Sequence, residues 1–314
     1  MALPQDLANI VGPSHVLTGD DTAPYAMDWI RVYPSSPLAV VRPQNTQQVA
    51  QIVRYANDHG VALVPMGGNT GLSGATQANG AVIVSLERMN AIHDIRPAAR
   101  IAVVQAGAVL SQVHAAVDDH NMVFPVTFGA RGSATIGGIL STNAGGSNVL
   151  RYGNTRDRVM GIEAVLPDGR VLNAMSQLHK DNSGYDLRHL LMGAEGTLGI
   201  ITAAVLKLAP KPKAYATAMI AARSLSDALD VLNDLQDATG GGVEAFEYMP
   251  RDYVQAHLDH KPNARAPFDE MYDVNIMVEI ATTVDDMARP NSAGQISLVS
   301  LLEHTLAQFL DRGA

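Results

Sequence analysis

Two glycine-rich segments constrain the fold of this chain more than any other feature. The first, PMGGNTGLSGA, spans residues 65–75 and follows the apolar run 61–64, and the second, GARGSATIGGILSTNAGGSN, spans residues 129–148. Glycine loses much backbone entropy on folding, so clusters of it need a reason. Successive backbone N–H groups in tight turns bind anions, and the missing Cβ lets a phosphate approach. Two such segments favour a phosphate cradle, whereas either one alone could be a tight surface turn.

Apart from Arg131, the polar side chains of the second segment are neutral. They include the hydroxyls of Ser133, Thr135 and Ser141 and the amide of Asn143. Many neutral donors with almost no charge suit an extended ligand whose pyrophosphate is neutralised by backbone dipoles.

Common nucleotide and hydrolase motifs are missing from the sequence. Asn69 stands where the second glycine of G-x-G-x-x-G is needed, and no Gly-Lys dipeptide provides a P-loop. The sequence has neither G-x-S-x-G nor H-E-x-x-H. His257 and His260 are three apart on a predicted helix, where we expect a solvated face rather than a metal site, so no metal is predicted.

Composition excludes several classes of function. The 314 residues suggest about two domains, and a net charge of −9 argues against binding to nucleic acid. No apolar run approaches the roughly 20 residues that span a bilayer, so we expect no integral membrane protein. The absence of cysteine excludes disulfides and thiolate sites. We expect a cytoplasmic protein without a secretion signal, and leave a peripheral association with the membrane open.

Hydrophobic periodicity predicts an alternation of helices and strands. A helix should begin with Thr46 as its cap and end at Gly60. A second helix is expected over residues 108–121, and Pro167-Asp168-Gly169 should join two strands within residues 159–172. Further strands are predicted at residues 61–64, 81–86, 101–105 and 198–208.

A Pro/Lys stretch at residues 209–213 predicts the boundary between a domain of residues 1–212 and one of residues 213–314. The second domain should contain strands at residues 215–222, 243–249 and 274–281, and helices at residues 226–239, 251–258 and 297–312. The last helix carries one apolar stripe, formed by Leu298, Leu301, Leu302, Leu306, Phe309 and Leu310. The stripe must be buried. We expect an incomplete second domain, and the alternatives are packing on the three strands present or a homodimer.

Three long stretches carry a family resemblance. They are PMGGNTGLSGA, GSATIGGILSTNAGGSNVLRYGNTRDRVMGIEAVLPDGRVL and KDNSGYDLRHLLMGAEGTLGIITAAVLKLAP. In this order they resemble the FAD-binding PCMH-type domain of the vanillyl-alcohol oxidase superfamily, in its D-2-hydroxyacid dehydrogenase branch. The resemblance implies an α+β protein, in which a PCMH-type FAD-binding domain of two α/β subdomains precedes a partial α+β substrate or cap domain.

The resemblance also implies cofactor-binding residues. The pyrophosphate would be wrapped by Pro65, Gly67, Gly68, Asn69, Thr70, Gly71, Leu72 and Ser73. The flavin and ribityl chain would be lined by Pro125, Gly132, Ser133, Thr135, Ile136, Gly137, Gly138, Asn143 and Gly145. Gly199, Ile200 and Ile201 would hold the adenosine or the ring edge. The alternatives are core packing for Ile136 and Ile200 and a turn-closing role for Asn143.

The implied reaction oxidises a D-2-hydroxyacid, of the 2-hydroxyglutarate, lactate or glycolate class, by hydride transfer to flavin N5. A quinone or an electron-transfer flavoprotein would accept the electrons. The first glycine loop has no histidine and the chain no cysteine, so FAD should be non-covalent. The family's late His-rich stretch has no counterpart, which leaves the catalytic residues unknown and suggests a C-terminal truncation.

Three residues could approach the flavin, but each has an equally good alternative. Arg151 and Tyr152 follow the second glycine segment, and Arg151 could instead pair locally. Tyr185 could instead fill the core. A same-fold flavoenzyme with another substrate and a non-catalytic FAD-binding protein stay open as alternative functions.

Overall fold

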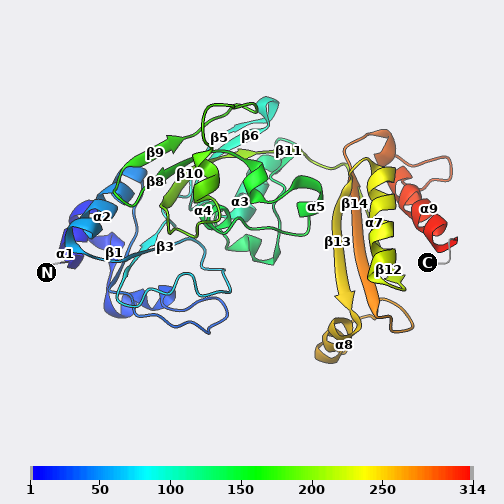
Figure 1. Cartoon of the computed structure of the whole chain (residues 1–314), viewed down its shortest axis with the longest axis horizontal. Helices are drawn as coiled ribbons and strands as arrows, with labels where there is room; N and C mark the ends of the chain where they lie inside the picture. The colour runs from blue at the N-terminus through cyan, green and yellow to red at the C-terminus, as the bar shows by residue number, and fades with distance from the viewer. Residues whose placement is uncertain (1–2, 312–314) are drawn as a thin grey trace. The chain divides into compact units, whose positions relative to one another are not determined.

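The computed structural model describes residues 3–311, which divide into two compact units (Figure 1). Unit 1 comprises Met1–Ala144 and Asn154–Ala209, and unit 2 comprises Gly145–Gly153 and Pro210–Ala314. The chain therefore leaves unit 1 twice. It first leaves within the second glycine segment, after Ala144, and it leaves again after Ala209, at the predicted Pro/Lys stretch.

The first sheet of unit 1 has the strand order β1-β2-β4-β3. Its strands are β1 (Val16–Leu17), β2 (Ala39–Val41), β3 (Leu63–Met66) and β4 (Val82–Ser85). Strands β2, β4 and β3 run parallel, so their carboxyl ends meet at one edge. Helices α1 (Leu3–Val11) and α2 (Thr46–His59) contribute Leu7, Val49 and Ile52 to the core of this sheet.

Two details of this region differ from the sequence predictions. The cap of α2 is Asn45, whose side chain accepts a hydrogen bond from the N–H of Gln48 at 2.9 Å. Thr46 is buried inside the helix and donates to Glu163. Strand β3 lies two residues later than predicted and is mostly half-buried. The end of α2 at Gly60 is confirmed, since this glycine has φ 64°.

The second sheet of unit 1 is antiparallel, with the order β5-β6-β10-β8-β9. Its strands are β5 (Ile92–Arg96), β6 (Ile101–Gln105), β8 (Val159–Val165), β9 (Val171–Ala174) and β10 (Ile200–Lys207). The predicted turn between β8 and β9 is confirmed, with Gly169 at φ 77°. Residues of α3 (Leu110–Asp118) and α4 (Ile136–Ser141) share a core with this sheet.

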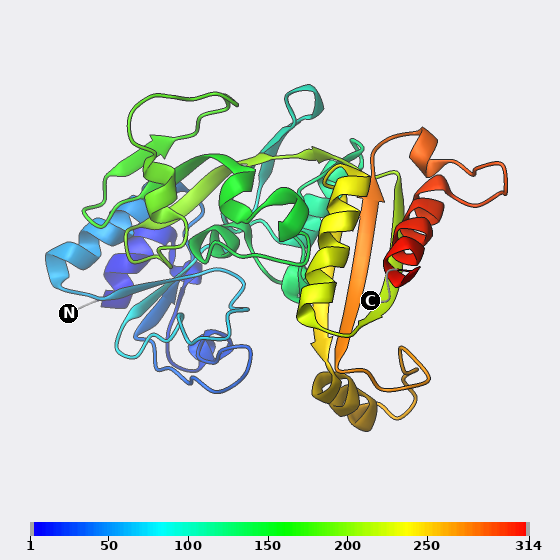
Figure 2. The ribbon, with the colours of Figure 1, turned by 45° about the vertical axis from the view of Figure 1, so that its right-hand side comes forward.

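Unit 2 is a three-stranded antiparallel sheet covered by helices (Figure 2). The central strand β14 (Val274–Thr282) lies between β12 (Ala214–Ala222) and β13 (Val243–Pro250). Helices α7 (Leu225–Thr239) and α9 (Ser297–Asp311) pack together on one face of the sheet, over Ile220, Ile276 and Val278 among others. The remaining elements of the chain are short or peripheral: η1 (Pro13–His15), η2 (Gly19–Tyr25), η3 (Pro97–Ala99), β7 (Met122–Val123), η4 (Gly129–Gly132), α5 (Val149–Tyr152), η5 (Thr155–Arg158), α6 (Leu187–Leu191), β11 (Ala209–Pro210), α8 (Arg251–His260) and η6 (Asp286–Ala288).

The apolar stripe of α9 is buried largely within unit 2. Leu298, Leu302 and Phe309 join the core between α9 and the sheet, whereas Leu310 is 60% exposed. Packing on the strands present thus accounts for Leu298, Leu302 and Phe309, and an incomplete second domain stays a prediction. Arg312, at the predicted end of this helix, lies outside the described residues.

Candidate cofactor-binding site

The two glycine segments meet in unit 1 at the carboxyl end of β3. A Cβ on Gly67 would stand 2.3 Å from the hydroxyl oxygen of Thr135, and a Cβ on Gly68 would stand 1.9 Å from the carbonyl oxygen of Ser133. Side chains cannot occupy such distances, so this contact requires glycine at both positions. The structure therefore brings together two segments that are far apart in the sequence.

The backbone of the second segment is fixed along residues 106–110. The N–H of Leu110 donates to the carbonyl of Ala134, the N–H of Ile136 to Ala108, and the N–H of Gly137 to Ala106. A Cβ on Gly137 would come within 2.8 Å of the Ala106 side chain. These contacts position residues 134–137 of the second segment beside the first segment.

A cavity of about 330 Å³ opens between these segments, within the size range of small-molecule sites. The residues that line it all belong to unit 1: Pro24, Tyr25, Met66, Gly67, Gly68, Asn69, Glu87, Asn90, Gly107, Val109, Gln112, Ser133 and Thr135. Five of them were predicted as cofactor residues from the sequence.

The hydroxyl of Thr135 tests whether the cavity suits a phosphorylated ligand. Thr135 is only 6% exposed, and its hydroxyl has no hydrogen-bond partner within the described part of the chain. A buried polar group without a partner costs roughly 1–3 kcal/mol. Ligand oxygens could satisfy it, and the glycine backbones leave room for them. The residues present therefore fit the pyrophosphate region of FAD.

Asn69 braces the first loop with its side chain. Its Nδ2 donates to the carbonyl of Met27 at 2.8 Å, and its Oδ1 accepts from the Thr76 hydroxyl at 2.7 Å. Both ends of the amide are thus used within the protein, at a residue with φ 50°. A side-chain contact from Asn69 to pyrophosphate stays a prediction.

The other predicted cofactor residues do not line the cavity. Ile136, Ile200 and Ile201 are buried in the cores of unit 1. Asn143 has φ 47° and accepts a hydrogen bond from the N–H of Arg156 at 2.9 Å, which makes it a structural turn residue. The remaining ones lie in β3, in η4 and α4, or in loops: Pro65 in β3, Gly132 in η4, Gly137 and Gly138 in α4, and Thr70, Gly71, Leu72, Ser73, Pro125, Gly145 and Gly199 in loops. A cofactor role for these residues stays a prediction.

Sequence reasoning missed an acidic group in the cavity wall. The Tyr25 hydroxyl donates to the two carboxylate oxygens of Glu87 at 3.0 and 2.9 Å, and Arg42 donates to Glu87 at 3.2 Å. Burial, followed by the hydrogen bond to Glu87, raises the pKa of Tyr25. Glu87 can approach the cavity because Gly107 packs against the backbone of Leu86, where a Cβ would stand 2.0 Å from the carbonyl oxygen.

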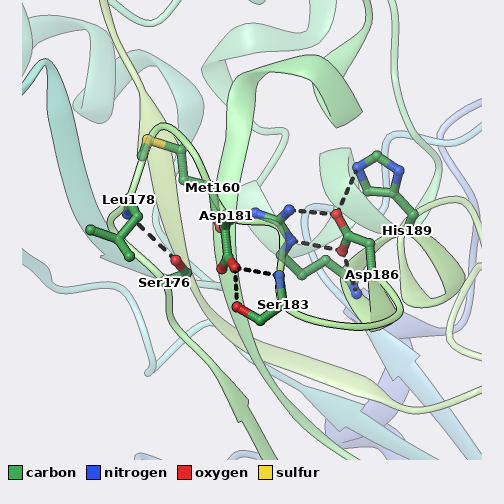
Figure 3. A network of polar contacts seen from close by, with 8 residues as sticks. Met160, Ser176, Leu178, Asp181, Ser183, Asp186 and His189 are labelled. Carbon is green, nitrogen blue, oxygen red and sulfur yellow. Dashed lines mark hydrogen bonds and ion pairs between the residues drawn. The ribbon is translucent and has the colours of Figure 1, made fainter.

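The segment that contains Tyr185 is braced by polar contacts of its own (Figure 3). Asp186 accepts from Nε of Arg188 at 2.8 Å, and Asp181 accepts from the Ser183 hydroxyl at 2.5 Å. Hydrogen bonds from Arg188 lower the pKa of Asp186. Tyr185 itself is 96% exposed, so the prediction that it could fill the core is wrong.

Arg151 and Tyr152 are engaged within unit 2. Arg151 donates to the Glu244 carboxylate at 2.7 Å and to the carbonyl of Ala281 at 3.1 Å, and the Tyr152 hydroxyl donates to Glu244 at 2.9 Å. Burial raises the pKa values of both Tyr152 and Glu244. The local pairing of Arg151 that the sequence allowed is therefore observed.

Within residues 3–311, no metal cluster competes with this interpretation. Residues 3–311 contain no group of three or more His, Asp or Glu side chains that could hold a metal ion. His257 and His260 are exposed on α8, as expected for a solvated helix face. Among the helices that the structure describes, none is long and apolar enough to span a membrane.

Residues 37–175 match the family model described as an FAD binding domain, which includes both glycine segments. The fold points the same way: the structure superposes on alkyldihydroxyacetonephosphate synthase with a TM-score of 0.73 and 18% identity, over 98% of this chain and 57% of that one. The segment that forms the candidate site is thus similar to FAD-binding domains, in agreement with the sequence resemblance, and the chain shares its fold with that synthase.

Several relatives are D-2-hydroxyglutarate dehydrogenases. The enzyme of Xanthomonas citri pv. viticola is 41% identical over 262 residues, which cover 83% of this chain and 55% of the relative. That of Stutzerimonas stutzeri is 38% identical over 289 residues, covering 91% and 62%. The mitochondrial enzyme of Bos taurus is 38% identical over 271 residues, covering 84% and 50%. The chain thus spans about half the length of the curated relatives it matches.

Proposed function

We propose that this chain serves the FAD-dependent oxidation of a D-2-hydroxyacid, such as 2-hydroxyglutarate, lactate or glycolate, to the 2-oxoacid. The observation that carries the proposal is the contact of the two glycine segments beside the unpartnered Thr135 hydroxyl. The similarity to D-2-hydroxyglutarate dehydrogenases supports the reaction class. FAD, when bound, supplies the acceptor for the hydride that leaves the substrate carbon.

The chain's own residues would bind and orient the cofactor. The backbones around Gly67 and Gly68 would approach the pyrophosphate, and the Thr135 hydroxyl would hydrogen-bond to it. FAD should be non-covalent, because the first loop has Asn69 rather than histidine and cysteine is absent. Acid precipitation should therefore release the flavin, and flavin that stays on the precipitated protein would contradict this.

The organisation and context of the protein follow as further parts of the proposal. Residues 1–212 would form the FAD-binding domain, and residues 213–314 a partial substrate-binding or cap domain. A quinone or an electron-transfer flavoprotein would take the electrons in a cytoplasmic setting, and a homodimer is compatible with this scheme. No catalytic base is assigned.

The test is the visible absorbance of the purified chain after incubation with FAD, followed by anaerobic addition of D-2-hydroxyglutarate, D-lactate or glycolate. The expected result is bleaching of the flavin by D-2-hydroxyglutarate or D-lactate but not by the L enantiomer, or bleaching by the achiral glycolate. A flavin spectrum that no hydroxyacid bleaches would favour the alternatives of another substrate or of non-catalytic FAD binding. Failure to bind FAD would overturn the proposal.

A further inference from the structure

Glu87 occupies a special position relative to the glycine loop. Strands β3 and β4 are parallel neighbours, with Met66 paired to Ser85, and the N–H of Leu86 donates to the carbonyl of Met66 at 3.1 Å. Gly68 follows the end of β3, and Glu87 follows the end of β4. Both residues therefore lie at the carboxyl edge of the same parallel pair, and both line the cavity.

The Glu87 carboxylate is oriented but not saturated. It accepts a hydrogen bond from the Tyr25 hydroxyl, which is shared between the two carboxylate oxygens, and one from an N–H of Arg42. A carboxylate offers about four acceptor positions, so it can still accept from a ligand. The Glu87 side chain is 41% exposed and is therefore accessible.

Arg42 makes a carboxylate compatible with a nearby anion. Its guanidinium pairs with Glu87 and also donates to the carbonyl of Ser14 at 2.7 Å, which fixes the arginine beside the acid. The local pair is formally neutral. The pyrophosphate would therefore meet glycine backbones on one side and a neutralised acid on the other.

A carboxylate next to a phosphate cradle has a characteristic chemical use. In Rossmann dinucleotide sites an acidic residue beyond the glycine loop accepts a hydrogen bond from a ribose hydroxyl, and a carboxylate at the same edge of a parallel strand pair offers this chemistry on a different fold. We propose that Glu87, oriented by Tyr25 and Arg42, accepts hydrogen bonds from the vicinal ribose hydroxyls of the adenosine half of FAD. The inference rests on the proposed function, and it assigns the Glu87 side of the cavity to the adenosine end. It also predicts that a phosphate on the 2′-hydroxyl is rejected.

The experiment compares the affinity of the protein for ADP, 2′-deoxy-ADP and 3′-deoxy-ADP, each measured by displacement of FAD. Because a hydrogen bond to a charged group is at stake, ADP should bind roughly tenfold more tightly than at least one deoxy analogue. In Glu87→Gln this preference should fall below about threefold. Tyr25→Phe, which keeps the carboxylate but loses its orienting hydroxyl, should lie between the two.

The matched control is Asp6→Asn. Asp6 also accepts a hydrogen bond from a tyrosine, with Tyr55 at 3.0 Å, but it does not line the cavity. Asp6→Asn should leave the preference for ADP unchanged. Direct titration with FMN, which lacks the adenosine, adds a second readout: Glu87→Gln should weaken FAD binding and change FMN binding by less than about twofold.

Two results overturn the inference while leaving the proposed function intact. One is equal affinity of the unsubstituted protein for ADP and both deoxy analogues. The other is a preference that survives in Glu87→Gln. If the unsubstituted protein binds neither FAD nor ADP, the proposed function fails instead.

Discussion

The candidate site of unit 1 and the core of unit 2 are built in different ways. In unit 1, the walls of the candidate site are made by backbone at positions where a methyl group has no room, as at Gly68 and Gly107. In unit 2, side chains hold the structure: alternate strand residues pack under α7 and α9, and Arg151 and Tyr152 converge on the buried Glu244.

This difference shows where ligand binding and stability should separate. Where glycine backbones leave no room for side chains, polar groups such as the Thr135 hydroxyl have no protein partner and can hydrogen-bond to a ligand. Side-chain packing leaves few such atoms, and the Glu244 carboxylate is satisfied by its own neighbours. We therefore expect substitutions in the glycine walls of unit 1 to act on FAD affinity, and substitutions around Glu244 in unit 2 to act on folding.

The largest effect is expected for Glu244→Ala. This change leaves the Arg151 guanidinium and the Tyr152 hydroxyl without their shared acceptor, with the side chains of Arg151 and Glu244 only 15% and 9% exposed. Removal of one partner of a buried ion pair costs about 3–5 kcal/mol. The free energy of unfolding should fall by that order in a urea titration, while FAD affinity of the remaining folded protein changes little.

Two control variants define the cause. Glu244→Gln keeps an acceptor for Arg151 and Tyr152 and should lose less stability than Glu244→Ala. Asp285→Ala breaks the exposed pair between Lys213 and Asp285, whose nitrogen and oxygen are 2.6 Å apart, and should have little effect. Equal losses in Glu244→Ala and Asp285→Ala would show that the Arg151–Glu244 contact does not stabilise unit 2.

The next effect, on FAD affinity, is expected for Gly68→Ala. The added Cβ would overlap the Ser133 carbonyl, so the two walls must separate. Overpacking of this kind costs about 1–3 kcal/mol, which corresponds to a roughly ten- to hundredfold weaker binding of FAD. Flavin fluorescence titration measures it. Gly129→Ala, whose Cβ meets nothing within 4 Å, is the control, and equal affinities of the two variants would contradict the site.

Local sequence signals predicted most of the elements. The strand at residues 101–105 was placed correctly by its β-branched residues, and Gly60 ended its helix through the left-handed conformation that glycine allows. The cap was misplaced by one residue because both Asn45 and Thr46 can cap a helix, and burial of Thr46 against Glu163 decided between them.

The site was predictable only where it is glycine-rich. The glycine cluster predicted a binding role for Gly67 and Gly68. Nothing in the sequence distinguished Glu87 from a glutamate on an ordinary solvated surface. Its role depends on the parallel pairing of β3 with β4. Glu244 was missed for a similar reason, since its contact with Arg151 joins residues that only the folded chain brings together.

The smallest effect, a pH dependence, is expected at His114. Its Nε2 lies 3.1 Å from the carbonyl oxygen of Phe124 and 3.0 Å from that of Val126, on either side of Pro125. Burial above all, with a minor contribution from Arg131, lowers the pKa of His114 from 6.5. The folded protein then binds fewer protons than the unfolded chain between this lowered pKa and 6.5.

The sign of the effect follows from this difference. The contribution of His114 to stability is fully present above pH 6.5 and is lost as the pH falls from there toward the lowered pKa. His114→Gln keeps a donor for one carbonyl but does not titrate, so its free energy of unfolding should fall less steeply over this range than that of the unsubstituted protein. Urea titrations at several pH values measure both slopes. If the slopes are parallel, His114 titrates alike in the folded and unfolded chains, and burial of this residue does not link pH to the stability of unit 1.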